Sequence, residues 1–285
     1  MSAPANSNNQ SNQPAQPNQF DWSNAIVLDL ETQKSFEEVG GFQSGHEKLG
    51  VSFVGVYSFK ANKYVGFWEN ELPVLEKILL TDRPTVIGFN SKSFDFPVMQ
   101  PYMSQIQLST LPHLDILEEI VKALKFRLKL DTVATAVLGE GKSGHGLDAI
   151  RWFREGALDK LSKYCIDDVR VTKEVFEYGK NHGRLWYQQG GQLQPIPVHW
   201  GEPPFIPDQI AKAAEQHTQI KITYISLTPE GVKTIEEHII DPRSIQGLSL
   251  LAYSHTAQKE ITIPIHRIWS ISSTGQKSAH QASLL

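Results

Sequence analysis

Cysteine is almost absent from this chain of 285 residues, which contains only Cys165. A single cysteine excludes a disulfide framework and a cysteine-rich zinc site, and it suits a reducing, cytoplasmic compartment. Long apolar runs are absent as well, because none approaches the roughly 20 residues that a membrane-spanning helix needs. The first residues also lack the basic and apolar regions of a signal peptide. The sequence therefore predicts a cytoplasmic protein without a membrane contact.

Positive charge is scarce, because 27 basic residues face 31 acidic residues and give a formal net charge of −4. Proteins that hold nucleic acid through many phosphate contacts are usually basic, so the charge argues against a broad surface of that kind. It does not exclude a site in which carboxylates hold metal ions, since those carboxylates are counted in the −4. The apolar content of 40% suffices for one large core and a smaller second domain.

Charged residues are missing altogether from residues 1–20, where Asn, Gln, Ser, Pro and Ala predominate. Such a segment buries too little apolar surface to offset the entropy cost of ordering, so it is predicted to be a disordered tail. Residues 21–187 alternate between apolar strand-like runs and amphipathic helix-like stretches. This alternation predicts an α/β domain with a mixed sheet flanked by helices. The last of its helices is expected to end at Gly183.

Proline marks the next boundary, because five prolines in residues 188–209 predict a linker. In residues 210–273, a short helical stretch is followed by strand-like runs separated by turn signals, which predicts a small β-barrel. Residues 274–285 are expected to form a flexible tail. Two folded domains joined by a linker are thus predicted.

Two carboxylates interrupt the first buried strand, at Asp29 and Glu31 in the run IVLDLET. Residues i and i+2 of a strand project from the same face, so the two side chains are expected to lie together. Neighbouring carboxylates repel each other unless a cation lies between them. The alternative is a strand end with two solvated acids.

A third carboxylate, Asp95, follows a second apolar strand in VIGFNSKSFDFPVM. The strand is predicted to end near Asn90 and a helix to begin near Asp95, so Asp95 is either a helix cap or a metal ligand. The Asn90 side chain is expected to brace the turn or to bind a substrate phosphate. Phe94 and Phe96 are expected in the core.

The third motif, YCIDDVRVT, lies on the long helix before Gly183 and contains Tyr164 and Asp168. With a spacing of four residues, these side chains share one helix face. A tyrosine hydroxyl beside a reactive water can orient that water for in-line attack. Asp167 is the neighbouring alternative, but the YxxxD spacing selects Asp168. The other interpretation is an ordinary exposed helix face, with Cys165 as a packing residue.

In this order, the three motifs resemble those of the DEDD 3′–5′ exonucleases, which have an RNase H-like fold. The resemblance covers about residues 20–185, and the second motif is most similar to the proofreading domains of family B DNA polymerases and to related bacterial nucleases. The stretch LDTVATAVLGEGKSGHGL, before the third motif, is similar as well. The YxxxD spacing is that of the tyrosine branch, because Lys163 stands where the histidine branch has a histidine.

The resemblance implies that four carboxylates hold two Mg²⁺ or Mn²⁺ ions and that a tyrosine positions the attacking water. These residues are Asp29, Glu31, Asp95, Asp168 and Tyr164. The ions would activate the nucleophile and stabilise the leaving 3′-oxygen, and oxygen ligands favour Mg²⁺ or Mn²⁺ over zinc. The implied activity is hydrolysis of single-stranded DNA or RNA from the 3′ end, with release of nucleoside 5′-monophosphates. The alternative is a catalytically silent protein on the same fold that binds nucleic acid or a partner.

A loose nucleotide-binding pattern occurs at residues 136–143, where AVLGEGKS matches a P-loop with Ala in place of the first glycine. A P-loop follows a buried strand, whereas the stretch DTVATAVL is predicted to be helical, so ATP binding is disfavoured. Lys142 is instead grouped with other basic residues that could meet backbone phosphates or form an ordinary solvated helix face. These are Lys122, Lys125, Arg127 and Lys129.

Residues 210–273 resemble a WYL domain, a small Sm/SH3-like barrel found on bacterial regulators and nucleic-acid enzymes. The similarity lies in the segments ITY, IDPRSI, LLAY and PIHRIWSI, whereas the name-giving triplet is eroded to LSL at residues 248–250. The resemblance implies that the domain senses a nucleotide or nucleic acid, with Arg243 and Arg267 as candidate contacts. The alternative is a barrel that supports the catalytic domain or an oligomer interface.

Overall fold

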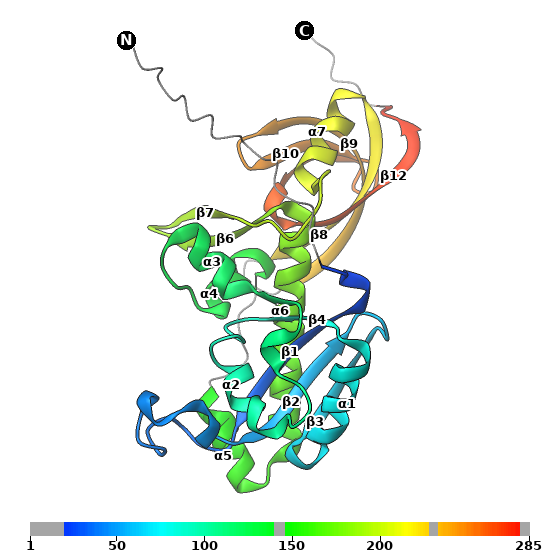
Figure 1. The fold of residues 1–285 in the computed structure, drawn as a ribbon. Coiled ribbons are helices and arrows are strands. Elements are labelled where there is room, and N and C mark those ends of the chain that lie inside the picture. The colour runs from blue at the N-terminus through cyan, green and yellow to red at the C-terminus, as the bar shows by residue number, and fades with distance from the viewer. Residues whose placement is uncertain (1–19, 140–145, 228–232, 280–285) are drawn as a thin grey trace, which may run out of the picture.

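The computed structural model describes residues 20–139, 146–227 and 233–279. The predicted disordered tail, apart from Phe20, and Lys142 lie outside these ranges. Figure 1 shows an α/β unit at one end of the molecule and a smaller β unit at the other, with helix α6 running from the first toward the second. Among the described residues, no helix combines the length and apolar character needed to cross a membrane.

The α/β unit is built on a five-stranded sheet with the order β3-β2-β1-β4-β5. β1 pairs antiparallel with β2 and parallel with β4, so the sheet is mixed. The mixed sheet predicted from the alternation of strands and helices is thereby confirmed. The strands are β1 (Ala25–Thr32), β2 (Val51–Ser58), β3 (Lys63–Trp68), β4 (Thr85–Gly88) and β5 (His113–Asp115).

Helices cover both faces of this sheet. The long predicted helix is α6, and Gly183 ends it in the left-handed conformation with a φ of 67°. The helices are α1 (Leu72–Asp82), α2 (Asp95–Met99), α3 (Ile116–Leu124), α4 (Leu130–Leu138), α5 (Gly146–Glu155) and α6 (Leu158–His182). Short 3₁₀ turns lie at Trp22–Asn24, Phe42–Ser44, His46–Lys48, Glu69–Glu71, Gln100–Tyr102, Leu108–Thr110 and Ile265–Arg267.

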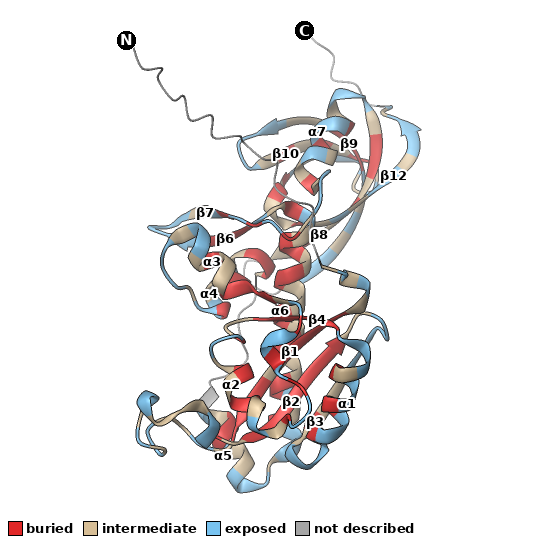
Figure 2. Ribbon diagram, viewed as in Figure 1, coloured by how far each residue is buried: buried red, intermediate tan, exposed pale blue. Residues whose placement is uncertain are grey.

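Alternate residues of β1 face two separate parts of the core. Val27 packs with residues of α4 and α6, whereas Leu28 and Leu30 pack with residues of α1 and α2. Figure 2 shows the central strands β1, β2 and β4 of this sheet as largely buried ribbon. Because side chains alternate along a strand, Asp29 and Glu31 lie on the α6 face.

The Pro-rich segment predicted as a linker, residues 188–209, is folded, so that prediction is wrong. Its first part completes a hairpin of β6 (Arg184–Gln189) and β7 (Gln192–Pro197), and the chain then reaches Trp200, which is buried. The Trp200 Nε1–H donates to the Phe176 carbonyl of α6 at 3.0 Å. The prolines are tolerated because, within the described chain, β7 pairs only with β6, so its outer edge needs no N–H donors.

The C-terminal unit is a five-stranded antiparallel sheet with the order β11-β10-β9-β8-β12, and it packs against α7 (Ile206–Glu215). This is consistent with the small β-domain expected from the sequence. The predicted start of the C-terminal tail, residue 274, lies too early in the chain, because Lys277 still pairs with Thr218. The strands are β8 (Thr218–Leu227), β9 (Lys233–Gln246), β10 (Ser249–Ser254), β11 (Lys259–Pro264) and β12 (Ile268–Lys277).

The C-terminal turns of α6 connect the two units. The Tyr178 hydroxyl donates to the carbonyl of His266 at 2.7 Å. The His182 ring stacks on Tyr178, and its Nε2 lies 2.8 Å from the carbonyl of Ile268. One continuous helix therefore carries the third sequence motif in its first half and the contact with the β unit in its second half.

Candidate active site

A cleft of about 1000 Å³ opens where the carboxyl end of β1 meets α2 and α6. Its walls include the beginning of the β1–β2 connection and the segment between α3 and α4. The cleft brings together the residues of all three sequence motifs, although they come from distant parts of the chain. These lining residues are Asp29, Glu31, Asn90, Asp95, Tyr164 and Asp168. Lys142 lies outside the described residues.

Asp29 and Glu31 lie along β1 on the face that packs toward α6. In the antiparallel ladder with β2 they stand opposite Gly55 and Phe53. Asp29 is half-buried, and Glu31 is only 7% exposed. The alternative of two solvated acids therefore does not hold for Glu31.

Asp95 is the first residue of α2, but it does not cap its own helix. β4 pairs with β1 only as far as Val27, and beyond that point the Leu30 N–H donates to Asp95 Oδ1 at 3.1 Å. The carboxylate thus takes the place of a strand partner at the edge of β1. Leu30 stands between Asp29 and Glu31 in the sequence. This bond therefore holds the Asp95 carboxylate near both acidic residues of β1.

The electrostatics of Asp95 show how crowded the cleft floor is. Burial, and then the negative charge of Asp29, raise the pKa of Asp95 well above the usual value of a carboxyl group. The Leu30 N–H opposes this rise in part. A divalent cation between the two carboxylates would offset both the burial of charge and the repulsion.

α6 brings Tyr164 and Asp168 to the same floor, because Gly55 lets the helix approach β2. A Cβ atom at Gly55 would lie 2.9 Å from Val169. Asp168 is only 1% exposed. Asp167 instead accepts a hydrogen bond from Arg170 Nε at 2.9 Å, and it does not line the cleft.

Tyr164 is held in its protonated form. Burial, followed by the charges of Asp168, Glu31 and Asp29, raises the pKa of Tyr164. Its hydroxyl is hydrogen-bonded to Asp168, and Trp152 packs against its ring with centroids 5.7 Å apart. A neutral phenol in this position can donate a hydrogen bond while its ring remains fixed by packing.

Cys165 lies closer to the acidic residues than its expected packing role indicates. Its sulfur and the carboxylate oxygens of Asp29 and Glu31 all lie within 4.8 Å of one another. Burial, and then these carboxylates, raise the pKa of Cys165, so the thiol stays neutral and is a poor ligand for a hard cation. The usable donor set is therefore oxygen-only, which fits Mg²⁺ or Mn²⁺.

Aromatic residues form one wall of the cleft, and no sequence motif predicted this role for them. Phe36 and Phe94 line the cleft and contact each other edge to face at a centroid distance of 6.1 Å. Phe42 stacks on Phe36 at 4.0 Å and is 75% exposed. Phe94 is half-buried and packs against the core as predicted, while it also lines the cleft, and Phe96 is buried as predicted. The sequence signal that could have revealed this wall is Phe42 in the glycine-rich run GGFQSG, which has no strand or helix pattern that would bury it.

The basic residues that were grouped in the sequence lie in two different surroundings. Lys122 pairs with Glu119 at 2.8 Å on the outer face of α3, as in the solvated-face interpretation. Arg127 and Lys129, by contrast, line the cleft. Arg127 Nη2 donates to Asn90 Oδ1 at 2.7 Å, so the Asn90 side chain holds an arginine, while the Asn90 carbonyl accepts the N–H groups of Ser93 and Phe94 in the turn.

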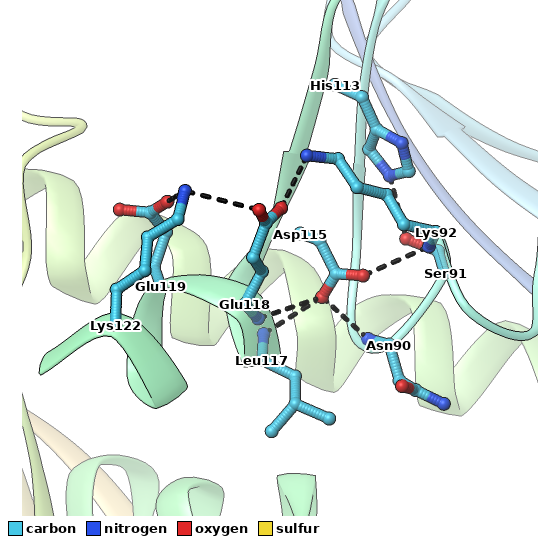
Figure 3. A network of polar contacts seen from close by, with 9 residues as sticks. All are labelled: Asn90, Ser91, Lys92, His113, Asp115, Leu117, Glu118, Glu119 and Lys122. Atoms are coloured by element: carbon cyan, nitrogen blue, oxygen red, sulfur yellow. Dashed lines mark hydrogen bonds and ion pairs between the residues drawn. The ribbon is translucent and has the colours of Figure 1, made fainter. Parts of the chain in front are cut away.

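Asp115 supports the loop that carries Asn90, as Figure 3 shows. Its carboxylate is buried and caps α3 by accepting the N–H of Leu117 at 3.0 Å. It also accepts the N–H groups of Asn90 at 2.8 Å and Lys92 at 3.0 Å. One buried carboxylate therefore ties the β4–α2 loop to the beginning of α3.

Comparison with known proteins supports the fold. A family model described as the RNase H superfamily matches residues 28–179, which is more than half of the chain. No curated protein matches. Among solved structures, proteasome accessory factor B/C (PafBC) of Arthrobacter aurescens matches with 18% identity over 56% of this chain and a TM-score of 0.24. The match covers 23% of that protein, so this chain spans less than a quarter of its length.

Proposed function

The chain belongs to the RNase H superfamily, and on that premise we propose that it is a 3′–5′ exonuclease dependent on two divalent metal ions. Members of this superfamily usually hydrolyse phosphodiester bonds. The proposed substrate is single-stranded DNA or RNA, and the proposed products are nucleoside 5′-monophosphates.

The observation that carries the proposal is the shared cleft. Four carboxylates and a tyrosine from β1, α2 and α6 line one cavity, and three of the carboxylates are buried. Burial and the negative charge of Asp29 raise the pKa of Asp95, and carboxyl groups with shifted pKa values in a cleft are typical of functional sites. A cation site accounts for that arrangement.

In the proposed site, the carboxylates of Asp29, Glu31, Asp95 and Asp168 hold two Mg²⁺ or Mn²⁺ ions. When bound, the ions supply the positive charge that lowers the pKa of the attacking water and stabilises the leaving 3′-oxygen. The Tyr164 hydroxyl, which donates its hydrogen to Asp168, accepts a hydrogen bond from the attacking water and so orients it for in-line attack. The phenylalanine wall gives the bases of a single strand a surface on which to stack.

The test is incubation of the full chain with single-stranded DNA and RNA oligonucleotides labelled at the 5′ end, with Mn²⁺, with Mg²⁺ and with chelator. We expect a ladder of products that shorten from the 3′ end and disappear on chelation. A 3′-terminal phosphate should slow the reaction. Retention of the oligonucleotide without cleavage in any metal would overturn the exonuclease proposal in favour of a binding protein.

For the C-terminal unit, we propose a WYL-like module that binds a nucleotide or nucleic acid. Arg267 lines a cavity of about 380 Å³ between α4, the β6–β7 hairpin and β8. Arg243 is instead ion-paired with Glu260. Arg267→Ala should therefore weaken binding of a nucleotide to this unit more than Arg243→Ala does, as measured by calorimetry.

A further inference from the structure

Arg127 occupies an unusual electrostatic position in the cleft. It is exposed, it lies between α3 and α4, and it lines the cleft. Its polar partner is the neutral side chain of Asn90, at 2.7 Å. Within the part of the chain that the structure describes, no acidic residue forms an ion pair with Arg127. Arg127 thus lines the same cleft as the acidic residues without an ion pair to any described residue.

Three other arginines of the α/β unit are ion-paired. Arg151 pairs with Asp148 at 2.9 Å, Arg154 with Glu38, and Arg170 with Asp167. A guanidinium has five N–H donors in a planar fork that matches phosphate oxygens, and Asn90 Oδ1 accepts from only one of its nitrogens. Among the described residues, the remaining donors of Arg127 form no hydrogen bond, so they can receive an anion from outside the chain.

The support behind Arg127 is rigid. Asn90 has a left-handed backbone with a φ of 69°, which asparagine tolerates better than most residues. Asp115 fixes that conformation by accepting the Asn90 N–H at 2.8 Å and the Lys92 N–H at 3.0 Å, as seen in Figure 3. Asn90 then holds the arginine through its side chain. A preorganised cation loses little entropy when it binds its ligand.

Resting on the proposed function, we propose that Arg127 anchors a non-scissile backbone phosphate of the bound strand. A guanidinium that shared the scissile phosphate with the metal ions would lie against their carboxylate ligands. Arg127 forms no ion pair with any carboxylate of the described chain, and Asn90 holds it on the β4–α2 side of the cleft. The site therefore selects polynucleotides over isolated phosphodiesters.

The test compares Arg127→Ala with Arg151→Ala, a matched variant that removes an ion-paired arginine outside the cleft. Each is assayed on a single-stranded oligonucleotide and on thymidine 5′-monophosphate p-nitrophenyl ester, which has only the scissile phosphodiester. Arg127→Ala should raise KM for the oligonucleotide about 10-fold with kcat unchanged, because one charge-assisted contact is lost. KM for the ester should not change. Arg151→Ala should match the wild type on both substrates.

Binding of a fluorescent oligonucleotide to the same variants, in Ca²⁺, gives a readout that does not depend on catalysis. For single strands, each phosphate contact contributes about 0.7 to the slope of log K against log salt concentration. Arg127→Ala should reduce the slope by about that amount, and Arg127→Lys should restore it because the charge returns.

Three outcomes would overturn the proposal: equal losses on the oligonucleotide and the ester, unchanged values on both, or an unchanged salt slope. If the wild type hydrolyses neither substrate, the exonuclease proposal fails, and the salt slope still decides the role of Arg127. Circular dichroism and the midpoint of thermal unfolding check that each variant is folded.

Discussion

The two halves of α6 bury the same kinds of polar side chain in different surroundings. In the N-terminal half, Tyr164 and Asp168 face the carboxylates of β1. In the C-terminal half, Tyr178 and His182 face backbone carbonyl groups of the β unit at 2.7 and 2.8 Å. Burial raises the pKa of both tyrosines, but only at Tyr164 do neighbouring negative charges raise it further.

This difference separates a structural polar contact from a functional one. A hydroxyl that donates to a carbonyl completes its hydrogen bonding within the protein and stabilises the fold. Carboxylates that lie close together repel one another, and a bound cation offsets the energy that this repulsion costs. Changes in the first half of α6 should therefore alter activity, and changes in the second half should alter stability.

The largest effect is expected from removing a carboxylate in the first half. Asp168→Asn keeps the side-chain shape but removes a metal-binding charge, so hydrolysis should fall by at least about 1000-fold. The midpoint of thermal unfolding should hold or rise, because like charges repel less. Asp167→Asn is the matched control, since Asp167 pairs with Arg170 away from the cleft. Similar activity losses in the two variants would contradict the assignment.

The tyrosine pair tests the comparison directly. Tyr164→Phe should lower kcat about 100-fold, because the attacking water loses its orienting group, and should lower the unfolding free energy only through the lost hydrogen bond to Asp168. Tyr178→Phe should leave kcat unchanged and lower the unfolding free energy by about 1–2 kcal/mol, because the carbonyl of His266 loses its donor. Steady-state kinetics and urea unfolding measure the two quantities. The idea fails if both variants lose activity alike.

Two glycines sharpen the comparison through packing. A Cβ at Gly55 would press on Val169 at 2.9 Å and move α6 away from Asp29, so Gly55→Ala should lower kcat about 10-fold or more. A Cβ at Gly179 would meet the Trp200 ring at 2.4 Å, so Gly179→Ala should lower the unfolding free energy by about 1–3 kcal/mol. Activity per folded molecule should survive in Gly179→Ala. A stable, fully active Gly55→Ala variant would show that close packing of α6 is unnecessary.

Acid should weaken the contact between the C-terminal half of α6 and the β unit, where the His266 carbonyl accepts from Tyr178. This effect should be the smallest of those predicted. Burial, with a smaller contribution from Arg267, lowers the pKa of His266 to about 4, whereas an unfolded histidine has a pKa of about 6.5. The unfolded chain therefore binds the proton first as the pH falls. The stability that the neutral ring contributes is complete above about pH 6.5 and is lost as the pH falls toward 4.

With allowance for partial exposure of the ring, the unfolding free energy should be about 1 kcal/mol lower at pH 5 than at pH 7 on account of His266. Urea unfolding at the two pH values measures the difference. His266→Gln should remove it, whereas His199→Gln should retain it because His199 is exposed. A pH dependence that is identical in both variants would exclude His266 as the cause.

Much of the α/β unit could be predicted from the sequence because its signals are local. The buried strand around Asp29, the helix that ends at Gly183 and the cap at Asp115 follow from residue periodicity and termination signals within a few positions. The linker prediction failed for the complementary reason. Prolines mark where a backbone cannot donate hydrogen bonds, but they do not show that Trp200 will find a place against Gly179 of α6.

The sequence by itself determined which side chains share a face. Glu31 accompanies Asp29, and Asp168 accompanies Tyr164, because two- and four-residue spacings are properties of the local backbone. Only the tertiary structure decided which faces meet.

The early end of β4 leaves the Leu30 N–H to Asp95, and Gly55 admits α6 to the floor of the cleft. The placement of Arg127 against Asn90 is likewise long-range. These contacts depend on packing between segments far apart in the chain, which no local spacing encodes.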